Sequence, residues 1–240
     1  MHKQGLTIAE NLAKIQERLL KTCDRVGRDP NEVILMGVTK FVPKDRIKEA
    51  FGAGIRYFGE SRVKEAAEKF SGFNEEFPEA FLHLIGSLQR NKVKQSLLLF
   101  DCIQSVDRIE LIEELIKQCF RDGVSLRDKP IKVLLELHTG EETKCGFADF
   151  DALFRAAQMV LSNPCLKPAG LMTMAPFTTD TSVIRSSFRL LVKAQKELEK
   201  RFGPKENWAV LSMGMSSDFE IAIEEGSNLL RIGSLIFSNN

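Results

Sequence analysis

The sequence of 240 residues lacks the features that mark membrane, secreted and nucleic-acid-binding proteins. It contains no run of about 18 apolar residues, so no transmembrane helix is expected, and its charged N-terminus has no apolar core of signal-peptide type. Its 34 lysines and arginines nearly balance its 33 aspartates and glutamates, which leaves a net charge of +1. A chain this close to neutrality has no bulk electrostatic attraction for nucleic acid or acidic membranes. We therefore expect a cytoplasmic protein.

The sequence also lacks the common cysteine and metal motifs. Its cysteines are odd in number, and no two have CxxC spacing: Cys23, Cys102, Cys119, Cys145 and Cys165. A disulfide framework or a zinc site is therefore not expected, and a reducing compartment fits better. No set of histidine, aspartate and glutamate has the spacing of metal ligands, and neither a GxSxG motif nor a glycine-rich nucleotide loop occurs.

What the sequence does contain is an alternation of short apolar runs with amphipathic segments. The apolar runs predict strands at 33–38, 56–59, 81–86, 102–106, 131–137, 166–172, 209–212 and 229–232. The amphipathic segments predict helices at about 7–26, 43–53, 61–70, 92–98, 109–121, 150–161, 182–202 and 219–225. Apolar runs of this kind are typical of parallel strands covered on both faces. The alternation favours one (β/α)₈ barrel domain over residues 1–240, although a doubly wound open sheet gives a similar pattern.

A lysine follows the first predicted strand. In a barrel, functional groups gather at the C-terminal ends of the strands, and Lys40 comes directly after the strand at 33–38. An amine held in the barrel mouth can attack an aldehyde to form an imine. A solvated lysine at the start of a loop is the alternative interpretation.

Small and hydroxyl-bearing residues follow the last two predicted strands. The segment 212–218 lies just before a helix, and Gly233 and Ser234 follow the strand at 229–232. Backbone N–H groups in such loops suit a phosphate, and a phosphate site after strands seven and eight recurs in barrels. Each motif alone is an ordinary turn, but together they indicate an anion site.

Two residues within predicted strands, Arg231 and His83, are further candidates for ligand binding. Arg231 falls near the barrel mouth, where a buried arginine needs acceptors. It either pairs with Glu136 or Asp218 or faces a ligand. Asp218 itself fits a helix cap. His83 is in the third predicted strand, where a histidine is more often a satisfied core residue than a catalytic one.

Six motifs, in this order and spacing, resemble the pyridoxal phosphate homeostasis protein family, also called YggS or PROSC proteins. They are GVTKFVP at 37–43, FGESRVKEA at 58–66, HLIGSLQRNK at 83–92, TKCGF at 143–147, GLMTMAP at 170–176 and LSMGMSSDFEIAIEEGSNLLRIGSLIF at 211–237. The resemblance covers nearly the whole chain. It implies a barrel like the N-terminal domain of alanine racemase, with pyridoxal 5′-phosphate (PLP) as cofactor.

The resemblance also implies a set of cofactor-binding positions: Lys40, His83, Met172, Ser212, Ser216, Arg231, Gly233 and Ser234. Lys40 matches the lysine that forms the Schiff base. Ser216, Gly233 and Ser234 match phosphate-contacting positions, with Ser212 beside them, and Met172 and His83 match residues that line the pocket. Arg231 matches an arginine that faces the pyridine nitrogen. An arginine there keeps that nitrogen unprotonated and weakens the ring as an electron sink.

The function that the resemblance implies is a non-catalytic carrier. Such a protein would take part in PLP homeostasis by buffering the reactive aldehyde and passing it to PLP-dependent apoenzymes. One position departs from the family, because Ser61 stands where asparagine is usual, and a serine lacks the reach of an amide.

Two other functions remain open. An amino-acid racemase needs a second acid or base opposite the lysine, and racemases that resemble this barrel take a tyrosine from a second, β-rich domain. The single tyrosine here is Tyr57, so a racemase would have to recruit Cys145, His83 or a partner subunit. The other candidate is a protein that binds a partner through the surface segment 89–92. The alternative interpretation of this segment is the solvent-exposed start of a helix.

Overall fold

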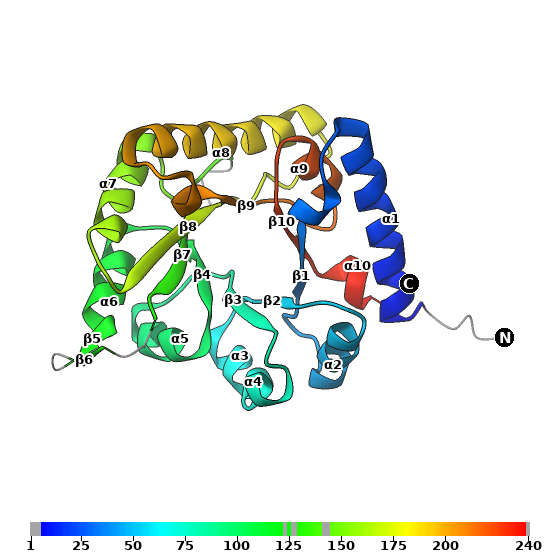
Figure 1. The fold of residues 1–240 in the computed structure, drawn as a ribbon, viewed down its shortest axis with the longest axis horizontal. Helices are drawn as coiled ribbons and strands as arrows, with labels where there is room; N and C mark the ends of the chain where they lie inside the picture. Colours follow the sequence, from blue (N-terminus) through cyan, green and yellow to red (C-terminus); the bar gives the residue numbers. More distant parts are fainter. Residues whose placement is uncertain (1–5, 122–123, 126–128, 141–144, 239–240) are drawn as a thin grey trace.

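Eight parallel strands close into a barrel in the computed structural model, which describes residues 6–121, 124–125, 129–140 and 145–238 (Figure 1). The ring order is β1-β10-β9-β8-β7-β4-β3-β2. The strands are β1 Ile34–Val38, β2 Tyr57–Glu60, β3 Phe81–Leu84, β4 Cys102–Val106, β7 Ile131–Glu136, β8 Leu166–Met172, β9 Val210–Ser212 and β10 Leu229–Ile232. Closure through the β1–β10 pair confirms the predicted barrel and excludes the open sheet.

Helices surround the ring of strands on its outer side (Figure 1). They are α1 Ile8–Val26, α2 Lys44–Gly52, α3 Val63–Phe70, α4 Phe73–Glu76, α5 Val93–Leu99, α6 Ile109–Cys119, α7 Phe150–Leu161, α8 Thr181–Phe202, α9 Phe219–Glu224 and α10 Ser234–Phe237. Short 3-10 helices occur at η1 Pro30–Glu32, η2 Arg90–Lys92 and η3 Lys205–Trp208. None of the helices described is both long and apolar enough to cross a membrane.

Three short features were not predicted from the sequence. They are α4, α10 and an antiparallel ribbon formed by β5 Phe120–Arg121 and β6 Val124–Ser125. The helix predicted at 109–121 ends at Cys119, which is the last residue of its buried face, and the chain then enters β5. A four-residue helix and a two-residue strand are too short to show a periodicity in the sequence.

The strands separate two apolar regions. On β7, Ile131, Val133 and Leu135 pack in the large core under the helices, whereas Leu134 packs with Cys102 and Met172 in a small cluster within the barrel. Side chains alternate along a strand, so Lys132 and Glu136 share the inner face with Leu134. The inner cluster therefore lies between a charged residue near each mouth of the barrel.

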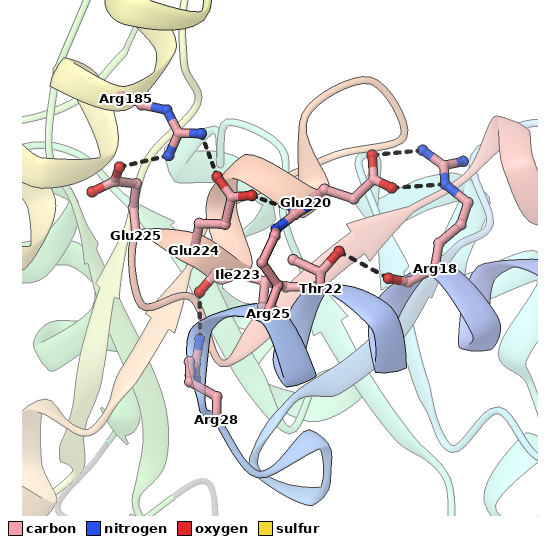
Figure 2. Close-up of polar contacts among 9 residues, drawn as sticks. All are labelled: Arg18, Thr22, Arg25, Arg28, Arg185, Glu220, Ile223, Glu224 and Glu225. Carbon is pink, nitrogen blue, oxygen red and sulfur yellow. Dashed lines mark hydrogen bonds and ion pairs between the residues drawn. The ribbon is translucent and has the colours of Figure 1, made fainter.

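Helix α1 runs along α9 and α10 and closes one side of the barrel (Figure 1). Its N-terminus has a capping box, in which Thr7 and Glu10 exchange hydrogen bonds. Figure 2 shows its ion pairs with α9, including Arg18 with Glu220 at 2.9 Å. Exposed pairs of this kind stabilise weakly. The buried amide of Asn11 donates to the Ile236 carbonyl oxygen at 3.0 Å, so α1 also fixes α10, which follows the last strand.

Candidate functional site

The two mouths of the barrel differ in which predicted residues they hold. Seven of the eight predicted positions lie at or just beyond the C-terminal ends of strands: Lys40, Met172, Ser212, Ser216, Arg231, Gly233 and Ser234. His83 is the exception. It lines a cavity together with Tyr57 and Phe81, which begin β2 and β3, so it lies toward the N-terminal mouth.

Lys40 lies beside the end of β10. Strands β1 and β10 pair in register, with Gly37 opposite Ile232. Gly233 then packs against β1 so closely that a Cβ there would lie 3.4 Å from the Cβ of Val38. Lys40 and Ser234 are both exposed, and the Lys40 amine has no hydrogen bond or ion pair with any other described residue. The structure therefore brings the strand end that leads to Lys40 next to the predicted phosphate-binding turn.

The backbone on both sides of Lys40 is held by ionic groups from β2 and α3. The Lys69 ammonium donates to the Thr39 carbonyl oxygen at 2.5 Å and pairs with Glu60 at 3.0 Å and Glu65 at 2.6 Å. Glu65 also accepts the Phe41 N–H at 2.7 Å. Phe41 has φ of 61°, the only left-handed non-glycine backbone among the described residues, and such a conformation persists only where its surroundings enforce it. We call Glu60, Glu65 and Lys69 the clamp.

Glu60 is the most buried member of the clamp. Its side chain is fully buried, and Oε1 accepts from the Thr39 hydroxyl at 2.7 Å. Burial raises the pKa of Glu60, while the hydrogen bonds from Thr39 and Lys69 act in the opposite direction. Its Oε2 is the one buried side-chain polar atom without a partner among the residues described. The positive charge of Lys69 thus offsets the free-energy cost of burying the Glu60 carboxyl group.

Arg231 is buried and bonded on one side only. Its Nη1 donates to the Ser212 carbonyl oxygen at 2.7 Å and to Ser212 Oγ at 2.6 Å, and its Nη2 donates to the Thr173 carbonyl oxygen at 2.8 Å. Burial lowers the pKa of Arg231 to about 10, so it stays protonated near neutral pH. A guanidinium has five N–H donors, and those on Nε and the rest of Nη2 have no partner among the described residues.

Glu136 and Asp218 influence Arg231 through charge rather than through a hydrogen bond. Both raise the pKa of Arg231 against the effect of burial. Asp218 occupies the N-cap position of α9, but its Oδ1 accepts the Met215 N–H at 2.6 Å, and its side chain makes no cap bond. It therefore fastens the loop that carries Ser216. The pairing of Arg231 with Glu136 or Asp218, considered from the sequence, is replaced by bonds to Ser212 and Thr173.

Glu136 should make the stability of the protein depend on pH. Burial, with Asp107 nearby, raises its pKa to about 7, and Arg231 opposes the shift. Between about pH 4.5 and 7 the folded state keeps a proton that the unfolded state loses, so stability falls as pH rises through this window. We expect Glu136→Gln to remove that fall. Relative to the native chain, it should gain up to about 3 kcal/mol on going from pH 4.5 to pH 8.

Urea unfolding at both pH values measures this difference. Glu110→Gln, which neutralises an exposed carboxyl on α6, is the control and should show no such gain. An equal pH response in the Glu136 and Glu110 variants would show that Glu136 is ionised in the folded protein at pH 5.

A hydrogen-bond chain that the sequence did not predict links Arg231 to His83. Ser212 Oγ donates to Gln104 Oε1 at 2.6 Å, and Gln104 Nε2 lies 2.8 Å from His83 Nδ1. The alternation of inward positions along β4 is the only sequence signal for Gln104, and it does not distinguish a polar bridge from a core residue. His83 thus contacts the predicted site through Gln104 and Ser212.

The remaining predicted features lie near the C-terminal mouth. Ser61 follows β2 and packs against the next loop, since a Cβ on Gly86 would lie 2.3 Å from the Ser61 carbonyl oxygen. The segment 89–92 borders a hollow of about 480 Å³ with Ser61 and Arg62. Cys145 is exposed, whereas Thr143 and Lys144 of the TKCGF motif lie outside the described residues.

Comparisons with known proteins give a consistent family. The family model described as "Alanine racemase, N-terminal domain" matches residues 7–240. The "Pyridoxal phosphate homeostasis protein" of Aquifex aeolicus is 36% identical over 234 residues, which cover 97% of this chain and 98% of that protein. The human protein of the same name is 34% identical and covers 94% of this chain and 84% of its own length.

Solved structures agree with these sequence matches. PipY from Synechococcus elongatus PCC7942, with PLP bound, superposes with a TM-score of 0.81 at 31% identity and covers 97% of this chain and all of its own. Alanine racemase from E. faecalis superposes with a TM-score of 0.67 at 17% identity, over 94% of this chain and 58% of the racemase. The racemase therefore shares the barrel fold.

Proposed function

This chain belongs to the pyridoxal phosphate homeostasis protein family, and on that premise we propose that it binds PLP covalently through Lys40. One observation carries the proposal. The β1–β10 register brings the chain segment that carries Lys40 next to the end of β10, and neither the Lys40 amine nor the remaining donors of Arg231 have a partner among the described residues. PipY, which this chain resembles over its full length, has PLP bound.

The donors at this mouth suit the parts of the cofactor. Lys40 supplies the amine for the aldehyde. The Ser216 and Ser234 hydroxyls and the Gly233 backbone supply uncharged phosphate donors on neighbouring loops, as in other barrels. The unused N–H groups of Arg231 suit an acceptor such as a ring nitrogen. We assign Met172 to the inner wall beneath these groups, because it ends β8 and is buried within the barrel.

A carrier fits these residues better than a racemase. PLP enzymes place either an aspartate or an arginine at the ring nitrogen, so Arg231 alone does not separate the two functions. Arg231 remains a donor at neutral pH, so it favours an unprotonated nitrogen. Tyr57 stacks on Phe81 at 5.0 Å at the opposite mouth, so it cannot serve as a second base beside Lys40.

Cys145 is the remaining candidate base on this side. It interacts with Asp107 and Ser87, which follow β4 and β3. Burial and the neighbouring carboxyl groups raise the pKa of its thiol, which makes it a poor base near neutral pH. We infer that the protein buffers PLP in the cytoplasm and passes it to PLP-dependent apoenzymes.

The test uses purified chain loaded with PLP and freed of excess cofactor. Incubated with L-alanine, it should show no sustained change in optical rotation, and its cofactor should reach an added apoenzyme faster than it appears free in solution. Continuous inversion of alanine, lost in Cys145→Ala, would establish the racemase instead. If transfer never exceeds free release, the delivery role is wrong and only buffering remains.

A further inference from the structure

The N-terminal mouth of the barrel contains a cavity with both apolar and charged residues in its lining, on the side opposite Lys40. Its volume is about 330 Å³, within the range of small-molecule sites. Its polar lining comprises Tyr57, His83, Asp101, Lys132, Lys167 and Glu206. The packed layer of Cys102, Leu134 and Met172 lies between this cavity and the C-terminal mouth. Nothing in the proposed function uses it.

Two lysines lie next to each other in the wall of this cavity. Lys132 on β7 and Lys167 on β8 are direct register partners. Neither forms an ion pair with a described residue. Like charges directly opposite each other on paired strands are unfavourable, and an anion bound between them would relieve that repulsion. Asp101 is already engaged, since its Oδ2 accepts the Leu82 N–H at 2.8 Å.

His83 adds a third donor, whose direction follows from the hydrogen-bond chain. Arg231 can only donate, so Ser212 Oγ, which accepts from it, donates onward to Gln104 Oε1. The Gln104 amide therefore presents its NH₂ group to His83 Nδ1, which must accept. Burial, with help from Lys132, lowers the pKa of His83 to about 3, so the ring is neutral. Its single hydrogen is consequently on Nε2.

The Nε2–H of His83 faces the cavity. No described residue accepts this hydrogen. His83 Nε2 is nevertheless not one of the fully buried side-chain atoms that lack a hydrogen-bond partner, so it is not fully buried. The atom therefore reaches accessible space, and the cavity is the space that His83 lines. Two exposed lysines without an ion pair in the described part of the chain, together with one ring donor, thus line the same pocket.

We propose that the N-terminal mouth binds a small organic anion, a carboxylate or a phosphate monoester, between Lys132, Lys167 and His83 Nε2–H. Asp101 and Glu206 at the same mouth disfavour large polyanions and restrict the ligand to low charge. An acceptor at Nε2 would strengthen the Gln104–His83 bond, because hydrogen bonds in a chain polarise one another. The site would therefore sense metabolite anions at the mouth that is not used for PLP.

Binding is tested on the purified chain without cofactor, using inorganic phosphate and succinate as separate probes and sodium chloride as the ionic-strength control. Histidine ¹⁵N NMR should show Nε2 protonated in the free protein and a saturable shift of the His83 Nε2 signal with at least one probe. A shift with phosphate alone indicates a phosphate ester, and a shift with succinate indicates a carboxylate.

The matched variants are Lys132→Gln/Lys167→Gln and Lys94→Gln/Lys196→Gln, which lose the same charge. The first pair should weaken binding at least tenfold, while the second, at exposed lysines on α5 and α8, should leave it unchanged. Equal weakening in both pairs, or no saturable shift with either probe, would overturn the proposal. This result does not depend on whether PLP binds Lys40, because the measurement is the His83 Nε2 signal of the protein without cofactor.

Discussion

Lys40→Ala is expected to abolish covalent PLP binding while the barrel stays folded. The side chain is exposed and makes no hydrogen bond or ion pair with a described residue, so the stability change should stay within about 0.5 kcal/mol. The native chain mixed with PLP should show the absorbance band of a lysine-bound cofactor, and borohydride should fix the cofactor to the peptide that contains Lys40. The variant should show neither the band nor the labelled peptide.

Lys48→Ala is the matched control, since Lys48 is exposed on α2 and, among the residues that the structure describes, pairs only with Glu76 at 3.0 Å. It should keep both the band and the label. Lys40→Arg provides a second comparison, because an arginine keeps the charge but is never deprotonated to an attacking amine. Retention of the band in Lys40→Ala, or a label on another lysine, would show that Lys40 is not the attachment point.

Lys69→Met is expected to destabilise the protein by about 3 kcal/mol at pH 8, because it leaves the buried Glu60 carboxylate without its cation. The loss should be smaller at pH 5, where Glu60, whose pKa is raised by burial, can take up a proton. The same change releases the Thr39 carbonyl oxygen, so the Lys40 backbone loses one of its fixed points. We expect slower attachment of PLP, measured by stopped-flow absorbance, with the Lys40 peptide still the labelled one.

Lys64→Met on the same helix is the control, because Lys64 is exposed and belongs to no ion pair in the described part of the chain. Adding Glu60→Gln to Lys69→Met should restore part of the lost stability, since the buried charge is then absent. If the double variant is as unstable as the sum of both single changes, Glu60 and Lys69 are not coupled.

The strands were predictable because each is a short, mostly apolar segment between amphipathic helices. The sequence predicts β4, β8 and β10 at their observed bounds, and the remaining barrel strands within two residues. Closure of the barrel could not be predicted, because the apolar pattern of one strand does not identify the strand with which it pairs. The open sheet therefore remained an alternative until the β1–β10 register was known.

The residues of the candidate site likewise fall into those that could be predicted from the sequence and those that could not. Residues that follow strands, such as Lys40 and Gly233, could be predicted because the C-terminal ends of parallel strands share one mouth. Gln104 and Lys69 could not, since their roles depend on partners from other strands and helices. His83 was assigned by resemblance to the cofactor pocket, and that assignment stays a prediction. The structure connects His83 to Arg231 through two other side chains.

The pairing of β1 with β10 has a consequence for biosynthesis. Lys40 is translated long before Gly233 and Ser234. A chain still on the ribosome has the amine but not the strand that completes its surroundings. On the proposed function, capture of the aldehyde should therefore begin only after β10 has been translated and has paired with β1.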